Sequence, residues 1–163
     1  MVSSYLSCLG FVPGPDLEHP FAYLKHGGLV RGKFGLNGER QFLGIPFGTP
    51  PTKDLRFREP REAPTWVGVK EALDFGRPCL QPSYPAGGWA SIENTKNSSE
   101  DCLYLNIVAP AESEPKKPWP VIVYFPAGEF HYGASSDKES DWPFFAEDVV
   151  LVSVNSRLGA LGY

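Results

Sequence analysis

The chain has 163 residues and a formal net charge of −4, with 15 Lys and Arg against 19 Asp and Glu. This length fits one ordinary domain, and an acidic balance without a basic cluster argues against nucleic acid as the main partner. Hydrophobic residues make up 42% of the chain, which excludes a disordered tail, and no apolar run approaches the ~18 residues needed to cross a bilayer.

The first part of the chain is predicted to be irregular. Residues 1–22 form this lead-in, and residues 23–163 form the domain that follows it. The first twelve residues carry no positive charge, so we expect a weak or missing secretory signal. The three cysteines, Cys8, Cys79 and Cys102, allow one disulfide with one cysteine left over, and by themselves they do not decide the compartment.

A β-hairpin is predicted next. Residues 28–34 and 40–45 are apolar segments on either side of Leu36-Asn37-Gly38-Glu39, and Asn-Gly between apolar segments is the strongest short hairpin signal. We therefore expect two antiparallel strands here. Residues 46–100 show no sustained helical periodicity and contain many prolines, which indicates a long irregular stretch that is functional or held by crosslinks.

Three further strands and one helix are predicted in the second half. Residues 103–109 alternate as a half-buried strand does. Residues 121–125 and 149–154 are apolar on both faces, which is typical of strands inside a parallel sheet covered by helices. Residues 141–147 have the N-cap and proline of a short helix between those strands. The pattern predicts an α/β protein in which an antiparallel opening hairpin precedes parallel strands.

The supply of helices is too small for such a sheet. Covering both faces takes several helices, and the sequence offers one short candidate. We favour an incomplete fold, and the alternative is a compact all-β domain that uses the strands in a sandwich. With residues 121–125 and 149–154 uncovered, we expect the 163-residue chain to be marginally soluble.

Five sequence blocks carry a resemblance to a known family, and the most specific has the core EDCLYLN at residues 100–106. The blocks are residues 32–33, 42–51, 55–60, 99–106 and 149–163. In this order they resemble the N-terminal part of the type-B carboxylesterases, the family that includes cholinesterases and the adhesion proteins called neuroligins. The resemblance implies the first part of an α/β-hydrolase fold, without a cofactor or metal.

The family's chemistry is the hydrolysis of small carboxylic esters. It uses a Ser nucleophile in a G-x-S-x-G elbow, a His base and a Glu or Asp that orients the His. These 163 residues contain no G-x-S-x-G, and the resemblance assigns none of His19, His26 and His131 to the base. It therefore implies a relative of serine esterases that is inactive as this chain alone. The alternative is a non-catalytic, neuroligin-like interaction protein.

One catalytic element is expected inside the chain, the loop whose backbone N–H groups stabilise the oxyanion. Residues 125–130 match this loop, and Gly128 and Glu129 match its N–H donors. Relatives typically carry glycines in this loop, so we expect Ala127 and Glu129 to restrict positive φ. A carboxylate near the oxyanion would oppose catalysis unless Glu129 points into solvent.

The resemblance also implies three structural features. Cys79 and Cys102 match a disulfide that closes an Ω-like loop, the alternative being two reduced thiols. Arg56 and Glu100 match an ion pair, the alternative being two separately solvated charges. Asn97-Ser98-Ser99 is an N-glycosylation sequon. Disulfide and sequon together favour a secreted or luminal protein.

Overall fold

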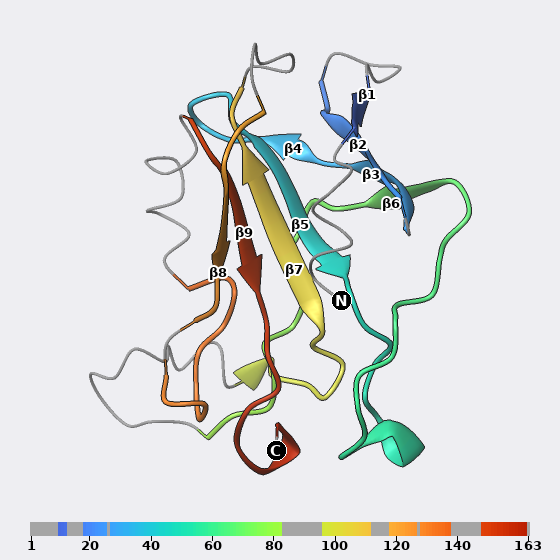
Figure 1. The fold of residues 1–163 in the computed structure, drawn as a ribbon, viewed down its shortest axis with the longest axis vertical. Helices are drawn as coiled ribbons and strands as arrows, with labels where there is room; N and C mark the ends of the chain where they lie inside the picture. The colour runs from blue at the N-terminus through green and yellow to red at the C-terminus, as the bar shows by residue number, and fades with distance from the viewer. Residues whose placement is uncertain are drawn as a thin grey trace.

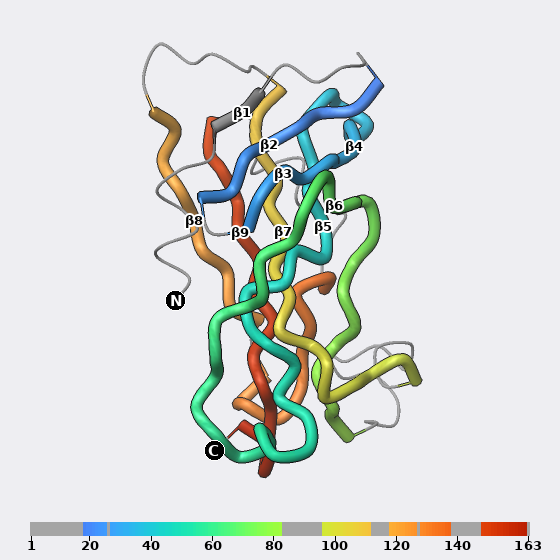
Figure 2. Tube along the Cα trace, turned by 90° about the vertical axis from the view of Figure 1, so that its right-hand side faces the viewer, coloured from blue at the N-terminus to red at the C-terminus, as the bar shows by residue number. Residues whose placement is uncertain are grey.

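The described residues of the computed structural model form two β-sheets (Figure 1 and Figure 2). The structure describes residues 10–12, 18–25, 27–82, 96–111, 118–126, 128–137 and 148–162. A four-stranded sheet has the strand order β1-β2-β3-β6, and a five-stranded sheet has the order β4-β5-β7-β9-β8. The elements are β1 (Gly10–Val12), β2 (Phe21–Leu24), β3 (Gly28–Arg31), β4 (Lys33–Phe34), β5 (Arg40–Pro46), η1 (Lys53–Leu55), β6 (Val69–Glu71), β7 (Tyr104–Ala109), β8 (Val121–Tyr124), β9 (Val150–Val154) and η3 (Gly159–Leu161).

The small sheet contains strands that the sequence did not predict. Strands β1, β2 and β3 form an antiparallel meander, and β6 adds to β3 in parallel. The prediction of an irregular lead-in over residues 1–22 is therefore wrong for β1 and for the start of β2. Phe21, Ala22 and Leu24 are buried, whereas Tyr23 is exposed. Strand β2 has only four residues, which is too short for a periodicity argument to detect.

The predicted hairpin is confirmed at its turn. Lys33 pairs with Gln41 in the antiparallel β4–β5 ladder, and Gly38 has a φ of 80° in the connection. The expected first strand, residues 28–34, is however divided at Gly32. Gly32 donates a hydrogen bond of 2.8 Å to the Pro20 carbonyl and separates β3 in the small sheet from β4 in the large one. One predicted strand thus serves two sheets.

A β-bulge in β5 attaches the irregular stretch to the large sheet. The register between β5 and β7 shifts between Phe42 and Ile45, and Gly44 within the bulge has a φ of 68°. A side chain on Gly44 would collide with the Asp74 carbonyl, so this backbone approach requires glycine. The neighbouring Leu43 amide donates to the Ala72 carbonyl at 2.8 Å.

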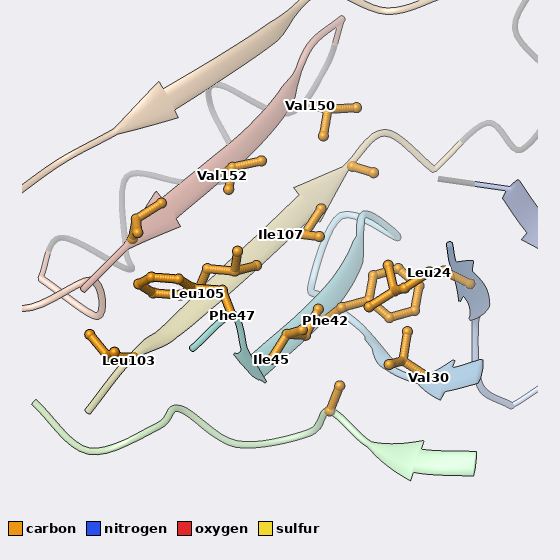
Figure 3. Packing of buried hydrophobic residues seen from close by; sticks show 14 of the residues in the cluster. Leu24, Val30, Phe42, Ile45, Phe47, Leu103, Leu105, Ile107, Val150 and Val152 are labelled. Atoms are coloured by element: carbon orange, nitrogen blue, oxygen red, sulfur yellow. The ribbon is translucent and has the colours of Figure 1, made fainter. Parts of the chain in front are cut away.

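The core lies on both faces of β7. On one face, side chains from both sheets meet (Figure 3): Leu24, Val30, Phe42, Ile45, Leu105, Ile107, Val150 and Val152. On the other face, Leu43, Val108 and Leu151 form a smaller cluster, against which Phe75 and Tyr124 pack. The prediction that residues 103–109 form a half-buried strand is corrected, since Phe75 from the irregular stretch helps to cover the second face.

Strand β8 lies at the edge of the large sheet. It pairs with β9 in parallel, as predicted, and β9 is the only strand beside it in the described sheet. Val121 and Ile122 are 42% and 45% exposed, which agrees with the expectation that residues 121–125 lack cover in this chain. The expectation that residues 149–154 lack cover is wrong for β9, which is buried along its whole length between β7 and β8.

A helix was predicted at residues 141–147, between β8 and β9, and these residues lie outside the described ranges. Among the described residues, no helical segment has the length and hydropathy of a membrane span.

Candidate functional site

The candidate site lies where the two parallel strands end. Strands β8 and β9 run in the same direction, and both point toward the end of the molecule opposite the small sheet (Figure 1). The segments that follow them meet there, because the Gly159 amide donates a hydrogen bond of 2.7 Å to the Phe130 carbonyl. The carboxyl ends of parallel strands are where α/β sheets bind ligands.

A tight turn at residues 128–132 contains the two expected N–H donors. The Gly128 carbonyl accepts hydrogen bonds from the amides of His131, at 2.8 Å, and Tyr132, at 3.2 Å. A side chain at position 128 would run into the main chain of Tyr132, so glycine is required. Glu129 and Phe130 have φ values of 53° and 62°. Glu129 therefore adopts the left-handed conformation that was expected to be restricted, at a cost of about 1–2 kcal/mol for an L-residue.

The turn presents its residues to solvent. Glu129 is exposed, and Phe130 is 74% exposed. Neither the Gly128 nor the Glu129 amide donates a hydrogen bond to another residue of the described ranges. The turn thus combines two donors that have no described protein acceptor with a carboxylate at the surface.

Two side-chain amides hold the segment that follows the turn. Gln81 and Gly133 form a two-way contact: the Gly133 amide donates to Gln81 Oε1 at 2.9 Å, and Gln81 Nε2 donates to the Gly133 carbonyl at 3.1 Å. The Ser135 amide donates to Asn155 Oδ1 at 2.8 Å. Asp137 Oδ2 accepts from the Ala134 amide at 2.7 Å. The path of residues 133–135 is therefore specified by three side chains from outside the segment, those of Gln81, Asp137 and Asn155.

A buried polar cluster lies beneath this segment. Asn106 of β7 is 1% exposed, and its Nδ2 donates to the hydroxyls of Ser135, at 2.9 Å, and Ser153, at 3.1 Å. Its Oδ1 accepts from the amide of Gly44 in the β5 bulge, at 2.9 Å. Every buried side-chain nitrogen and oxygen in the described residues has a hydrogen-bond partner. The cluster joins β5, β7 and β9 to the loop that follows β8.

These supporting residues were not predicted from the sequence. Asn106 and Ser153 are the polar residues within the apolar strands β7 and β9, and a buried polar group requires a partner. That signal was available in the sequence. Nothing in the sequence, however, indicates that Asn106 bonds to Ser135, which comes from a distant loop.

The structure contains the disulfide between Cys79 and Cys102, with a Cα–Cα distance of 4.9 Å. It also brings Arg56 and Glu100 together: Arg56 Nη2 donates to Glu100 Oε2 at 2.6 Å, and Arg56 Nε donates to Glu100 Oε1. The hydrogen bonds from Arg56, and secondarily its charge, lower the pKa of Glu100 below its ordinary value of 4.5. This fork joins the block around η1 to the segment just before Cys102.

A second polar contact lies beside the disulfide. The Tyr104 hydroxyl donates to Asp101 Oδ1 at 2.9 Å. Burial, the hydrogen bond and the charge of Asp101 raise the pKa of Tyr104 to about 12. Tyr104 therefore stays protonated and keeps donating at neutral pH.

The other candidate residues are dispersed. Asn97 of the sequon is exposed. His19 Nδ1 lies 3.1 Å from the Gly32 carbonyl, His131 is exposed in the turn, and His26 lies outside the described residues. No group of three or more His, Cys, Asp or Glu side chains suited to a metal ion occurs among the residues that the structure describes.

Comparison with known proteins decides the family. Residues 20–163 match the sequence model of the carboxylesterase family. The chain belongs to the carboxylesterase family. It is 39% identical over 125 residues to the cAMP-regulated D2 protein of Dictyostelium discoideum, a match that covers 76% of this chain and 23% of that protein. It is 34% identical over 172 residues to pyrethroid hydrolase Ces2a of Mus musculus, covering 97% of this chain and 30% of that protein.

The fold agrees with this family. The structure of the Geobacillus stearothermophilus carboxylesterase EST55 superposes on 88% of this chain and 27% of that chain, with a TM-score of 0.70 and 30% identity. The chain thus has the opening part of the α/β-hydrolase fold found in carboxylesterases, and the all-β sandwich considered from the sequence is excluded. It spans less than a third of the length of each of these three relatives.

Proposed function

We propose that this chain supplies the oxyanion-stabilising part of a serine carboxylesterase that hydrolyses small-molecule carboxylic esters. The observation that carries the proposal is the turn at the carboxyl ends of β8 and β9, where the amides of Gly128 and Glu129 have no acceptor among the described residues. In acyl transfer, such donors stabilise the negative charge that develops on the carbonyl oxygen, at roughly 2.7–4 kcal/mol for one donor.

The isolated chain is proposed to be inactive. Its 163 residues contain no G-x-S-x-G, and none of its three histidines is assigned to the base. An oxyanion site without a nucleophile can polarise a carbonyl group and cannot break its ester bond. The nucleophile, the acid and the base would come from the part of the relatives' length that this chain does not span.

Glu129 sets the strength of the proposed site. A carboxylate about 4 Å from the oxyanion would oppose it by about 4 kcal/mol at an effective dielectric of 20, which equals the contribution of one donor. Because Glu129 is exposed, solvent screens much of this repulsion. We therefore propose a working site that is weaker than one with glycine at this position.

A chimera tests the proposal. Residues 20–163 would replace the matching segment of the Geobacillus carboxylesterase, and hydrolysis of p-nitrophenyl acetate would be measured. We expect saturable turnover, and a higher kcat when Glu129 is replaced by Gly in the chimera. A folded chimera that shows no turnover with either residue would refute the proposal. The 163-residue chain alone, assayed in parallel, should show no saturable hydrolysis.

A non-catalytic interaction protein is the second candidate. It is favoured by the exposed Glu129 and Phe130 side chains, which place a charge and an aromatic ring at the turn. The chimera distinguishes the two candidates, because an interaction domain predicts no turnover even with Glu129→Gly.

We also propose that the protein is secreted or luminal and that it folds in an oxidising compartment. The Cys79–Cys102 disulfide and the exposed Asn97 support this. Expression in secretory cells should give a product whose gel mobility increases on treatment with an N-glycosidase. The Asn97→Gln variant should show no such shift. If the wild-type protein carries no glycan, the sequon does not support a secreted or luminal location.

A further inference from the structure

We propose that Asn155 and Gln81 are positioning residues that join the Cys79–Cys102 disulfide to the loop of residues 128–135, which contains the two expected oxyanion donors, Gly128 and Glu129, and the segment that follows them. The inference deepens the proposed function and rests on it for the role of this loop. The contacts that carry it are independent of any catalytic activity.

Asn155 bridges the disulfide segment and the loop through one buried side chain. It directly follows β9 and is 3% exposed. Its Nδ2 donates to the carbonyls of Arg77 and Cys102, both at 3.0 Å, and its Oδ1 accepts from the Ser135 amide. The side-chain NH2 group of Asn155 thus binds the chain near both cysteines of the disulfide, and its side-chain oxygen binds the loop.

Gln81 makes the same kind of bridge two residues after Cys79. Its Nε2 donates to the Cys79 carbonyl at 3.1 Å and to the Gly133 carbonyl, while its Oε1 accepts from the Gly133 amide. Gln81 and Asn155 therefore hold Gly133 and Ser135, on either side of Ala134. Two anchored residues so close in the chain leave the loop little freedom to shift relative to the disulfide.

The chemistry requires side-chain amides at both positions. Each side chain accepts a hydrogen bond from the loop and donates to carbonyls beside the disulfide. An ionised carboxylate keeps the acceptor and loses both donors. The variants Asn155→Asp and Gln81→Glu therefore keep the acceptors of the two loop amides and lose the donors to the disulfide segment, with almost no change in side-chain volume. Gln81→Glu also loses the donor to the Gly133 carbonyl.

This arrangement makes the disulfide a constraint on the loop as well as a crosslink of the irregular stretch. Without the disulfide, the distance between the Cys79 and Cys102 carbonyls is no longer fixed. Because the side chains of Gln81 and Asn155 bind these carbonyls, Gly133 and Ser135 then become more mobile as well. The expected result is faster amide hydrogen exchange in the loop, without a matching change in β7.

The test is hydrogen exchange by mass spectrometry on the 163-residue chain at low concentration, followed in peptides from residues 128–137 and from β7. Wild-type protein would be compared with Cys79→Ala/Cys102→Ala, with Gln81→Glu/Asn155→Asp and with the four-fold variant. Asn155→Asp alone serves if the double amide variant does not fold. Val154→Ala is the matched control, because this buried β9 residue adjoins Asn155 and packs in the core.

We expect loss of the disulfide to accelerate loop exchange at least 10-fold relative to β7 in the wild-type background. In the amide-variant background we expect less than a 3-fold further acceleration. Val154→Ala should accelerate the loop and β7 alike. Equal effects of disulfide loss in both backgrounds, or an effect of the amide variants that is as large in β7 as in the loop, would overturn the inference. An inactive chimera would count against the proposed function alone, since exchange in this chain involves no catalysis.

Discussion

The main-chain nitrogen of Gly159 lies 2.7 Å from the carbonyl oxygen of Phe130, so the segment after β9 is fastened to the turn after β8. The Phe130 peptide group is held while its side chain remains 74% exposed. The turn is thus fixed through its backbone, and its side chains are open to substitution.

Replacing Glu129 by Gly should stabilise the protein. Glu129 has a φ of 53°, where a side chain is strained and glycine is not. We expect the free energy of unfolding to rise by about 1 kcal/mol, measured by urea denaturation. Glu59→Gly is the control, since Glu59 is exposed and is not among the residues with positive φ. That control should lower stability by about 0.4–1 kcal/mol, and equal shifts in both variants would contradict the strain argument.

Replacing Asn106 by Leu should strongly destabilise the protein. Asn106 is fully buried, and its loss leaves the Gly44 amide without its acceptor and Ser135 and Ser153 without their donor. One unsatisfied buried group costs about 1–3 kcal/mol, so we expect a loss of about 3 kcal/mol in urea denaturation. Ser153→Ala removes one acceptor and should cost about 1 kcal/mol. A neutral Asn106→Leu variant would show that the polar cluster adds no net stability.

The Arg56–Glu100 ion pair should make stability depend on pH in the acid range. Arg56 lowers the pKa of Glu100 in the folded state, so Glu100 binds its proton more weakly there than in the unfolded chain. The stabilisation is therefore present above the ordinary pKa of 4.5 and is lost as the pH falls through the lower folded value. Thermal unfolding from about pH 7 to about pH 3 should fall less steeply for Glu100→Gln than for the wild type. Parallel curves would show that the pair contributes nothing measurable.

A charge on the exposed edge strand should reduce self-association. Ile122 lies on β8, which has no strand on its outer side in the described sheet, and it is 45% exposed. Lysine on an edge strand opposes edge-to-edge pairing, so Ile122→Lys should shift the sedimentation profile toward the monomer. Val67→Lys is the control, because Val67 is also exposed and lies outside the strands. Equal gains from both variants would assign the effect to net charge.

Local patterns predicted part of this fold well. The Asn37-Gly38 turn and the β5 strand follow from signals that lie within a few residues of each other. The parallel β8–β9 pair follows from two short apolar segments, each recognisable by itself. The EDCLYLN block identified the family, and with it the Cys79–Cys102 bond. Burial was harder to predict, since β7 and β8 are both apolar and their exposure depends on their place in the sheet.

The supporting contacts of the candidate site were beyond local patterns. Gln81, Asn155 and Ser135 are ordinary polar residues in the sequence, and they become partners only when segments 20 or more residues apart are folded together. Glu129 illustrates a second limit. Its left-handed φ is imposed by the turn that Gly128 closes, against the preference of its own side chain.

The position of β9 between β7 and β8 also has a consequence for synthesis of the chain. Strand β8 leaves the ribosome before the strand that pairs with it has been translated. Val121 and Ile122 therefore stay unpaired until β9 has emerged from the ribosome, and during this interval a chaperone can bind them. In a nascent chain arrested before Val150, the large sheet would lack both β9 and β8, because β8 joins this sheet only through β9.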